Sequence, residues 1–232
     1  MAELYKLTVN GLLDGAITED TDYCTFDVYI NTKCVAQTVA HFEYDNFPEG
    51  TYYEVKNIYA GTGKKYNGVN KGSLEGSITK DTLVQLKFSS IKYTITYDAN
   101  GGNETPIRQT KLHGKPITLS KQIEKSYYVY TTFDANGGKI DSSSSKLVSS
   151  KVYYPFNGWK ASNGVLYNAE TLYTTNESTT MTAQWGDVNG FSVHFPTDPT
   201  KEGYSFKGWY TSKTGGTKVT SYSPTSNTTL YA

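Results

Sequence analysis

Two short motifs each occur twice in this chain of 232 residues, and this repetition constrains the fold more than any other feature of the sequence. Asp-Ala-Asn-Gly-Gly stands at residues 98–102 and again at 134–138. Phe-x-Gly-Trp stands at residues 156–159 and again at 206–209. Internal repeats indicate structural modules in series, because each copy supplies the same local geometry.

Each Asp-Ala-Asn-Gly-Gly motif follows a run of alternating apolar and polar residues. Alternation of this kind is typical of a β-strand with one buried face. Asn-Gly readily supplies the pair of positive φ angles that a tight hairpin turn requires. We therefore predict one strand that ends in a turn at Asn100-Gly101, and another that ends in a turn at Asn136-Gly137.

The first ninety residues show the same alternation in short segments that include Leu7, Phe26, Val55 and Leu86. Turn residues separate these segments, and no window shows helical periodicity. Short strands with turn chemistry between them indicate a small antiparallel β-sandwich over residues 1–90. The predicted fold class is mostly β, with this sandwich followed by tandem modules.

We expect three domains: the sandwich at 1–90, an enlarged repeat module at 91–185 and a shortened module at 186–232. The first module would hold both Asp-Ala-Asn-Gly-Gly turns and one Gly-Trp. The second would hold the other Gly-Trp and no such turn. A shortened module should lean on its neighbour to bury its apolar face.

Composition favours several thin cores over one large aliphatic core. Tyr outnumbers Phe by 21 to 9, and hydrophobic residues, Tyr included, make up 37% of the chain. Tyr suits strands and half-buried surfaces, where one end of the side chain is dry and the hydroxyl is wet. The formal net charge is zero, so non-specific nucleic-acid binding has no electrostatic basis. The chain has neither an apolar stretch long enough to span a membrane nor an export signal at its start.

Two cysteines, Cys24 and Cys34, are expected to remain free thiols. If Asn31-Thr32 forms a hairpin turn, Tyr29 pairs with Cys34, and Cys24 lies roughly 16 Å further along the ladder. A disulfide needs Cα atoms within about 7 Å of each other. Free thiols suit a protein that folds in a reducing compartment.

Signatures of catalysis and cofactor binding are missing from the sequence. None of the three histidines, His41, His113 and His194, stands in a metal-binding or catalytic motif. The chain has no nucleophile elbow, Walker sequence or dinucleotide fingerprint. Asp-x-Asn-x-Gly in each turn motif is similar to the opening of a calcium loop, but the later acidic ligand is missing, and a hairpin turn accounts for the same residues. We expect no enzyme activity, no catalytic residue, no cofactor and no metal site.

Clusters of aromatic residues at 52–53, 127–130 and 153–154 are the remaining candidate surface. The faces of Tyr and Trp can stack on sugars or on partner proteins. Alternatively, one face of each strand fills a thin Tyr-rich core and the other is ordinary sheet surface. The sequence leaves both interpretations open.

The repeats resemble the Listeria–Bacteroides repeat, an internalin-type B repeat, over residues 93–232. The resemblance is carried by the two turn motifs, by Gly203-Tyr204-Ser205-Phe206-Lys207-Gly208-Trp209-Tyr210, by Gly215-Gly216 and by Thr229-Leu230-Tyr231-Ala232. It implies small β-grasp-like modules found in tandem on bacterial surface proteins. Residues 1–90 resemble small β domains that precede such repeats in proteins of Gram-positive bacteria and their phages.

The structural motif implied by this resemblance consists of turn residues and aromatic residues. These are Asn100, Gly101, Asn136, Gly137, Phe156, Trp159, Trp185, Phe206 and Trp209. Trp185 would close the first module, whereas the sequence reaches Ala232 before the corresponding position of the second.

We interpret the chain as a non-enzymatic structural protein of a phage virion, such as a capsid decoration, head fibre or tail appendage that displays β modules for adhesion. Surface-type repeats without an export signal, together with free thiols, favour this location, because virion proteins assemble in the host cytoplasm. The expected partners are capsid or tail proteins, host surface glycans and further copies of the chain, without nucleic acid or a membrane span. The alternative is a fragment of a secreted Gram-positive adhesin on the bacterial cell surface.

The two halves of the chain are expected to have different roles, one in docking and the other in display. Residues 1–90 would dock on a larger assembly through loops at Gly11–Asp22 and Gly61–Gly72, since loops suit shape-specific contact. Residues 93–232 would project, because repeated modules suit an extensible arm.

Overall fold

The computed structural model describes residues 3–232, and every regular element in them is a β-strand. The prediction of a mostly β fold is thereby confirmed. The chain forms two compact units. One holds the residues up to Thr94 together with Thr110–Ile117 and Thr174–Ser178, and the other holds Ile95–Gln109, Thr118–Tyr173 and Thr179–Ala232.

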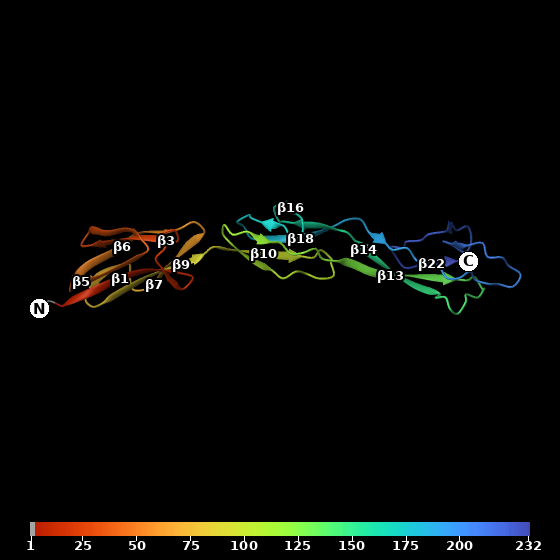
Figure 1. Ribbon diagram of the computed structural model, residues 1–232, viewed down its shortest axis with the longest axis horizontal. Helices are drawn as coiled ribbons and strands as arrows, with labels where there is room; N and C mark the ends of the chain where they lie inside the picture. The colour runs from red at the N-terminus through yellow and green to blue at the C-terminus, as the bar shows by residue number, and fades with distance from the viewer. Residues whose placement is uncertain (1–2) are drawn as a thin grey trace. The chain divides into compact units, whose positions relative to one another are not determined.

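The first unit contains two β-sheets that share one core (Figure 1). In one sheet, β1 pairs with β9 on one side and with β5 and β2 on the other, while β7 pairs with β9. Its strands are β1 (Leu4–Leu13), β2 (Ala16–Thr18), β5 (His41–Pro48), β7 (Lys64–Lys71) and β9 (Thr82–Ser90). The other sheet has the order β4-β3-β6-β8 and is antiparallel throughout. Its strands are β3 (Cys24–Ile30), β4 (Lys33–Val39), β6 (Thr51–Ala60) and β8 (Glu75–Ile78).

The core of this unit follows from the alternation in the sequence. Leu7 and Val9 of β1, Phe26 of β3, and Leu86 and Phe88 of β9 are completely buried in one cluster. Burial of each such side chain stabilises the fold by roughly 1.5–3 kcal/mol. The core therefore joins the two sheets into a sandwich.

Three expectations for the first unit are wrong in detail. Strands β1 and β9 pair in parallel, so the sandwich is not antiparallel throughout. The expected loop at Gly61–Gly72 is mostly β7, and a register shift between Tyr66 and Val69 absorbs the Asn67-Gly68 step as a bulge. The expected loop at Gly11–Asp22 contains the end of β1 and all of β2. Gly and Asn weaken a strand signal in the sequence, but a bulge accommodates both.

The first repeat module centres on β10, which pairs in parallel with β18. The order of its main sheet is β11-β10-β18-β15-β16, and β12 pairs with β17 beside it. Its strands are β10 (Lys92–Asp98), β11 (Gln109–Leu112), β12 (Ile117–Thr118), β15 (Phe156–Lys160), β16 (Leu166–Tyr167), β17 (Leu172–Tyr173) and β18 (Thr179–Trp185).

The second repeat module centres on β13, which pairs in parallel with β22 and antiparallel with β14 (Figure 1). The order of its sheet is β19-β14-β13-β22-β20-β21. Its strands are β13 (Lys125–Asp134), β14 (Leu147–Tyr154), β19 (Asn189–Gly190), β20 (Trp209–Tyr210), β21 (Lys218–Val219) and β22 (Thr228–Tyr231).

The two modules are interleaved along the chain. The first draws its strands from residues 92–118 and 156–185, and the second from residues 125–154 and 189–231. Each module therefore has one Asp-Ala-Asn-Gly-Gly turn and one Gly-Trp. This corrects the expectation that the first module holds both turns and the second holds none. The physical reason is that β13 places the ring of Phe133 against a tryptophan of the second module, with which it shares a core.

Candidate functional site

The two turn motifs have nearly the same backbone geometry. Asn100 and Gly101 have φ angles of 47° and 81°, and Asn136 and Gly137 have φ angles of 50° and 83°. The carboxylate that opens each motif accepts the backbone N–H of its Asn at 2.8 Å. Each carboxylate therefore caps a turn. The positive φ angles of the turn are those that an Asn-Gly pair readily adopts.

Trp159 lies at the centre of the first module. Its side chain is completely buried, and its ring meets Tyr97 edge-on at 4.8 Å and Phe156 at 5.1 Å between centroids. The indole N–H donates to the carbonyl oxygen of Ser120 at 3.0 Å. Edge-to-face packing and a satisfied N–H are the features expected of a core tryptophan.

Trp209 occupies the same place in the second module. Its ring is buried, and it meets Phe133 at 4.9 Å and Phe206 at 5.5 Å with similar tilts. Among the residues that the structure describes, however, its indole nitrogen has no hydrogen-bond partner. A buried donor without a partner costs about 1–3 kcal/mol.

Trp185 closes one edge of the first module. Its indole N–H donates to the carbonyl oxygens of Asn100 at 3.0 Å and Ala99 at 3.3 Å. Its ring lies 5.6 Å from Phe156, and the Nζ atom of Lys125 lies 5.7 Å from the ring centroid. Trp185 thus ties the last strand of the module to its turn.

A pocket of about 420 Å³ lies beside the turn of the second module. Ala135, Asn136, Lys201, Phe206 and Ala232 are among its lining residues. Its volume falls within the roughly 300–1,000 Å³ of ordinary ligand sites. Asn136 and Phe206 at this place are predicted from the sequence, whereas Lys201 is not, because no fixed spacing links that lysine to the repeat motifs.

The aromatic clusters divide between core and surface. Tyr53 is buried in the sandwich, whereas Tyr128 and Tyr130 of β13 have 63% and 47% of their surfaces exposed. Tyr128 and Tyr130 lie two residues apart on one face of the strand, and Tyr128 pairs with Lys151 of β14. Lys151 forms an ion pair with Glu124 at 2.6 Å. Exposed tyrosines beside a charged pair make this face a candidate contact surface of the second unit.

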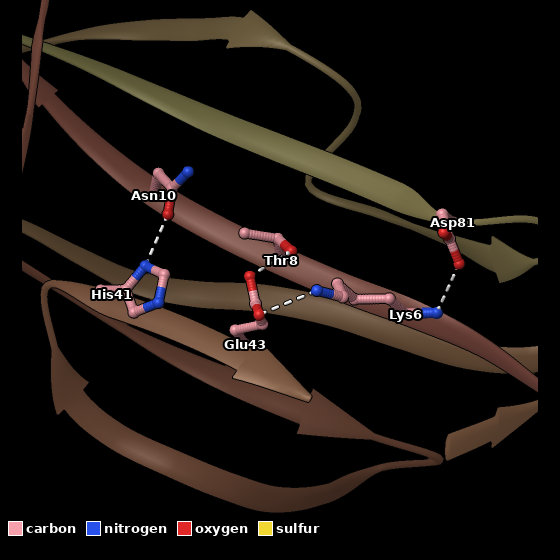
Figure 2. Close-up of polar contacts among 6 residues, drawn as sticks. All are labelled: Lys6, Thr8, Asn10, His41, Glu43 and Asp81. Carbon is pink, nitrogen blue, oxygen red and sulfur yellow. Dashed lines mark hydrogen bonds and ion pairs between the residues drawn. The ribbon is translucent and has the colours of Figure 1, made fainter. Parts of the chain in front are cut away.

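A ladder of polar contacts joins β1 to its neighbours in the first unit (Figure 2). Lys6 bonds Glu43 at 2.9 Å through its ammonium and Asp81 at 2.9 Å through its backbone N–H. Asn10 Oδ1 lies 2.6 Å from His41 Nδ1. The hydrogen bond between Lys6 and Glu43 raises the pKa of the lysine and lowers the pKa of the carboxyl. These contacts link β1 to β5 and to Asp81, so the ladder is a set of cross-strand contacts.

The histidines and cysteines likewise form no reactive cluster in residues 3–232. His113 Nδ1 lies 2.9 Å from the hydroxyl of Tyr93, and no group of three or more potential metal ligands gathers in this part of the chain. Tyr29 pairs with Cys34, as the predicted hairpin register requires. Cys24 is buried and its burial raises the pKa of the thiol, whereas Cys34 is exposed.

Within the described residues, no helix is long and apolar enough to cross a membrane.

Comparison with known proteins links the repeat geometry to a family. The sequence model of the Listeria–Bacteroides repeat domain matches residues 93–132 and 189–232. The chain carries Listeria–Bacteroides repeats. The first matched segment contains the turn at Asn100-Gly101 and the second contains Trp209, so the match includes parts of both repeat modules.

A relative and a solved structure extend the comparison. Internalin H of Listeria monocytogenes serovar 1/2a (strain ATCC BAA-679 / EGD-e) is 28% identical over an alignment 144 residues long that covers 50% of this chain and 26% of internalin H. The chain thus spans about a quarter of that relative. A double mutant of the shaft pilin SpaA from Lactobacillus rhamnosus GG aligns with 100% of this chain and 98% of the pilin chain, at 10% identity and a TM-score of 0.24. A TM-score this low supports no conclusion about fold or function.

Proposed function

We propose that this chain is part of a Gram-positive-type bacterial cell-surface protein, in which the Listeria–Bacteroides repeats display an adhesive face. Its action is binding and spacing, not catalysis. The observation that carries the proposal is the pair of repeat modules together with the similarity to internalin H.

The bacterial surface is better supported than the virion surface. The similarity to an internalin favours the adhesin alternative, whereas the virion interpretation rests on sequence arguments about export and free thiols. Strand β7 takes up most of the expected loop at Gly61–Gly72, and the end of β1 together with β2 takes up half of the one at Gly11–Asp22, which leaves less irregular surface for shape-specific docking.

The location can be tested by labelling. An antibody raised against the full chain should label intact, unpermeabilised cells of the source bacterium, and surface digestion with trypsin should remove the signal. A cytoplasmic marker should stay unlabelled in the same cells. Labelling of purified phage particles, with none on intact cells, would overturn the proposal in favour of the virion.

The adhesive face is assigned to the exposed tyrosines of β13. The aromatic rings of Tyr128 and Tyr130 can stack on the apolar faces of sugar rings, and the neighbouring ion pair of Lys151 and Glu124 can bond sugar hydroxyls. The corresponding ligand class is a surface carbohydrate chain.

A double variant tests this assignment. Tyr128→Ala/Tyr130→Ala should weaken binding of the chain to immobilised cell-surface glycans by tenfold or more without changing its thermal unfolding. Tyr44→Ala/Tyr59→Ala is the matched control, because these tyrosines of the first unit are similarly exposed, at 50% and 60%. Equal loss in both variants, or in neither, would contradict the assignment.

A further inference from the structure

A groove of about 680 Å³ lies in the second unit, with lining residues from both repeat modules. Phe156 of the first module lines it, together with Tyr153 and Phe191 of the second and the buried side chain of Ile123. The rings of Tyr153 and Phe191 lie 5.3 Å apart between centroids, with 32° between their planes. One side of the groove is therefore an aromatic wall, and the volume is that of an ordinary ligand site.

The groove is continuous with the exposed tyrosine face of β13. Tyr128 pairs with Lys151 of β14, and the Lys151 carbonyl accepts the backbone N–H of Phe191 at 3.2 Å. Residues that lie opposite each other on adjacent strands point to the same face of a sheet. Tyr128, Lys151 and Phe191 therefore form a row across three segments. Because Tyr128 and Phe191 are 63% and 55% exposed, a long ligand can lie along this row.

The charged residues that line the groove are Glu104, Glu124 and Lys151. Glu124 accepts hydrogen bonds from Lys151 and from the Ser126 hydroxyl, and both bonds lower the pKa of Glu124. Within residues 3–232, no hydrogen bond or ion pair engages the Glu104 carboxylate. Two carboxylates and one ammonium leave one net negative charge, so the groove complements a cationic ligand.

We propose that this groove binds a chain of amino sugars whose amines are not acetylated. The inference rests on the proposed function, because it names the sugar that the adhesive face would hold. The rings of Tyr153 and Phe191 would stack on the apolar faces of the sugar rings. Glu104 would pair with a sugar ammonium through a charge-assisted hydrogen bond. A lysine-rich peptide carries the same charge, but it lacks the flat apolar faces that match an aromatic wall.

Two hexasaccharides of β-1,4-linked glucosamine test the role of the charge. One has free amines and the other is fully N-acetylated, so the linkage and the length are the same. At about pH 5.5, free sugar amines are protonated and an ordinary glutamate is ionised. Isothermal titration calorimetry of the full chain should show about tenfold tighter binding of the free-amine form, because only that form can pair with Glu104. Added salt should reduce the difference.

Variants at the groove separate charge from shape. Glu104→Gln should lower the affinity for the free-amine form about tenfold and leave the affinity for the N-acetylated form unchanged. Glu202→Gln is the matched control, because Glu202 is an exposed residue of the same unit that does not line the groove. Phe191→Ala should weaken binding of both hexasaccharides, since it removes one ring of the aromatic wall. Thermal unfolding shows whether each variant keeps the fold.

Several results would overturn the assignment of an amino sugar. These are equal affinity for the two hexasaccharides, binding of neither, or equal effects of Glu104→Gln and Glu202→Gln. Hexalysine that binds as tightly as the free-amine form would overturn it as well, because the groove would then select charge alone. The proposed function fails on a separate result, in which Tyr128→Ala/Tyr130→Ala leaves binding to cell-surface glycans unchanged.

Discussion

The two repeat modules have the same strand pairing but differ in the hydrogen bonding of their central tryptophans. In the first, Trp159 donates its indole N–H to Ser120 and Trp185 covers the edge beside the turn. In the second, the N–H of Trp209 has no partner within the described residues, and a pocket lies beside the turn. Packing around the central tryptophan is thus alike, while the hydrogen bonding of its indole N–H differs.

Comparing the two modules shows which contacts are common to both repeats. The turn, the Gly-Trp aromatic pair and the parallel pairing of first and last strands are common to both modules. Within residues 3–232, the indole N–H of the central tryptophan has a partner in the first module only. We infer that the common set determines the fold and that this hydrogen bond adjusts the stability of each module.

The largest expected effect comes from removing residues 187–232. This truncation deletes β19–β22, and it leaves β13 and β14 as an isolated hairpin, which is marginally stable at best in water. Amides of residues 125–154 should lose their protection from hydrogen exchange, while those of the sandwich keep theirs. Retained protection at 125–154 would mean that this hairpin belongs to the first module.

Truncating the central tryptophans should be the next most severe change. Trp159→Ala and Trp209→Ala should each destabilise the protein by about 3–5 kcal/mol, as buried aromatic truncations do. The free energy of unfolding should fall further for Trp159→Ala, because this variant also loses the hydrogen bond to the Ser120 carbonyl. Urea denaturation followed by circular dichroism measures both, and a cost below 1 kcal/mol for either would contradict its place in the core.

Replacing the same residues by Phe isolates the hydrogen bond. Trp159→Phe removes the indole N–H that donates to the Ser120 carbonyl, which keeps only the longer hydrogen bond from the backbone N–H of Glu170, whereas Trp209→Phe removes a buried N–H that has no partner in the described residues. Trp209→Phe should therefore be milder by about 1 kcal/mol in the free energy of unfolding. Equal costs would indicate that the N–H of Trp209 is satisfied in solution.

Acid should weaken the second turn by a small amount. The backbone N–H of Asn136, with a smaller contribution from Lys213, lowers the pKa of Asp134. A lowered pKa stabilises the folded state above the unfolded value of about 3.9, and this stabilisation is lost as the pH falls through the folded value. Between pH 5 and pH 2, the Tm of Asp134→Asn should therefore fall by less than the Tm of the unmodified chain. If the Tm of both proteins fell equally, Asp134 would not contribute to the acid sensitivity of the turn.

Sequence reasoning was sufficient for local structure and insufficient for long-range pairing. The alternation around Leu7 and Phe26 and the cysteine hairpin register agree with the structure, because they depend on neighbouring residues. The interleaved order could not be predicted, because the two Asp-Ala-Asn-Gly-Gly turns are identical in sequence. Which Gly-Trp each turn meets is decided by contacts between residues far apart in the chain.

The candidate site was predictable to a similar extent. The motif tryptophans could be named from the repeats, whereas the lysines beside the two turns could not, because Lys125 and Lys201 reach the turns from distant segments. Likewise, the sequence did not predict β7, because Asn67-Gly68 has the composition of a loop. In the structure these residues form a bulge, and the strand around them pairs with β9.

Aromatic NOESY spectra of the full chain test the interleaving most directly. The account predicts cross-peaks between the rings of Phe133 and Trp209, whose centroids lie 4.9 Å apart, and between those of Tyr97 and Trp159, at 4.8 Å. Cross-peaks from Phe133 to Trp159, with none to Trp209, would contradict it and restore two modules that are contiguous in sequence.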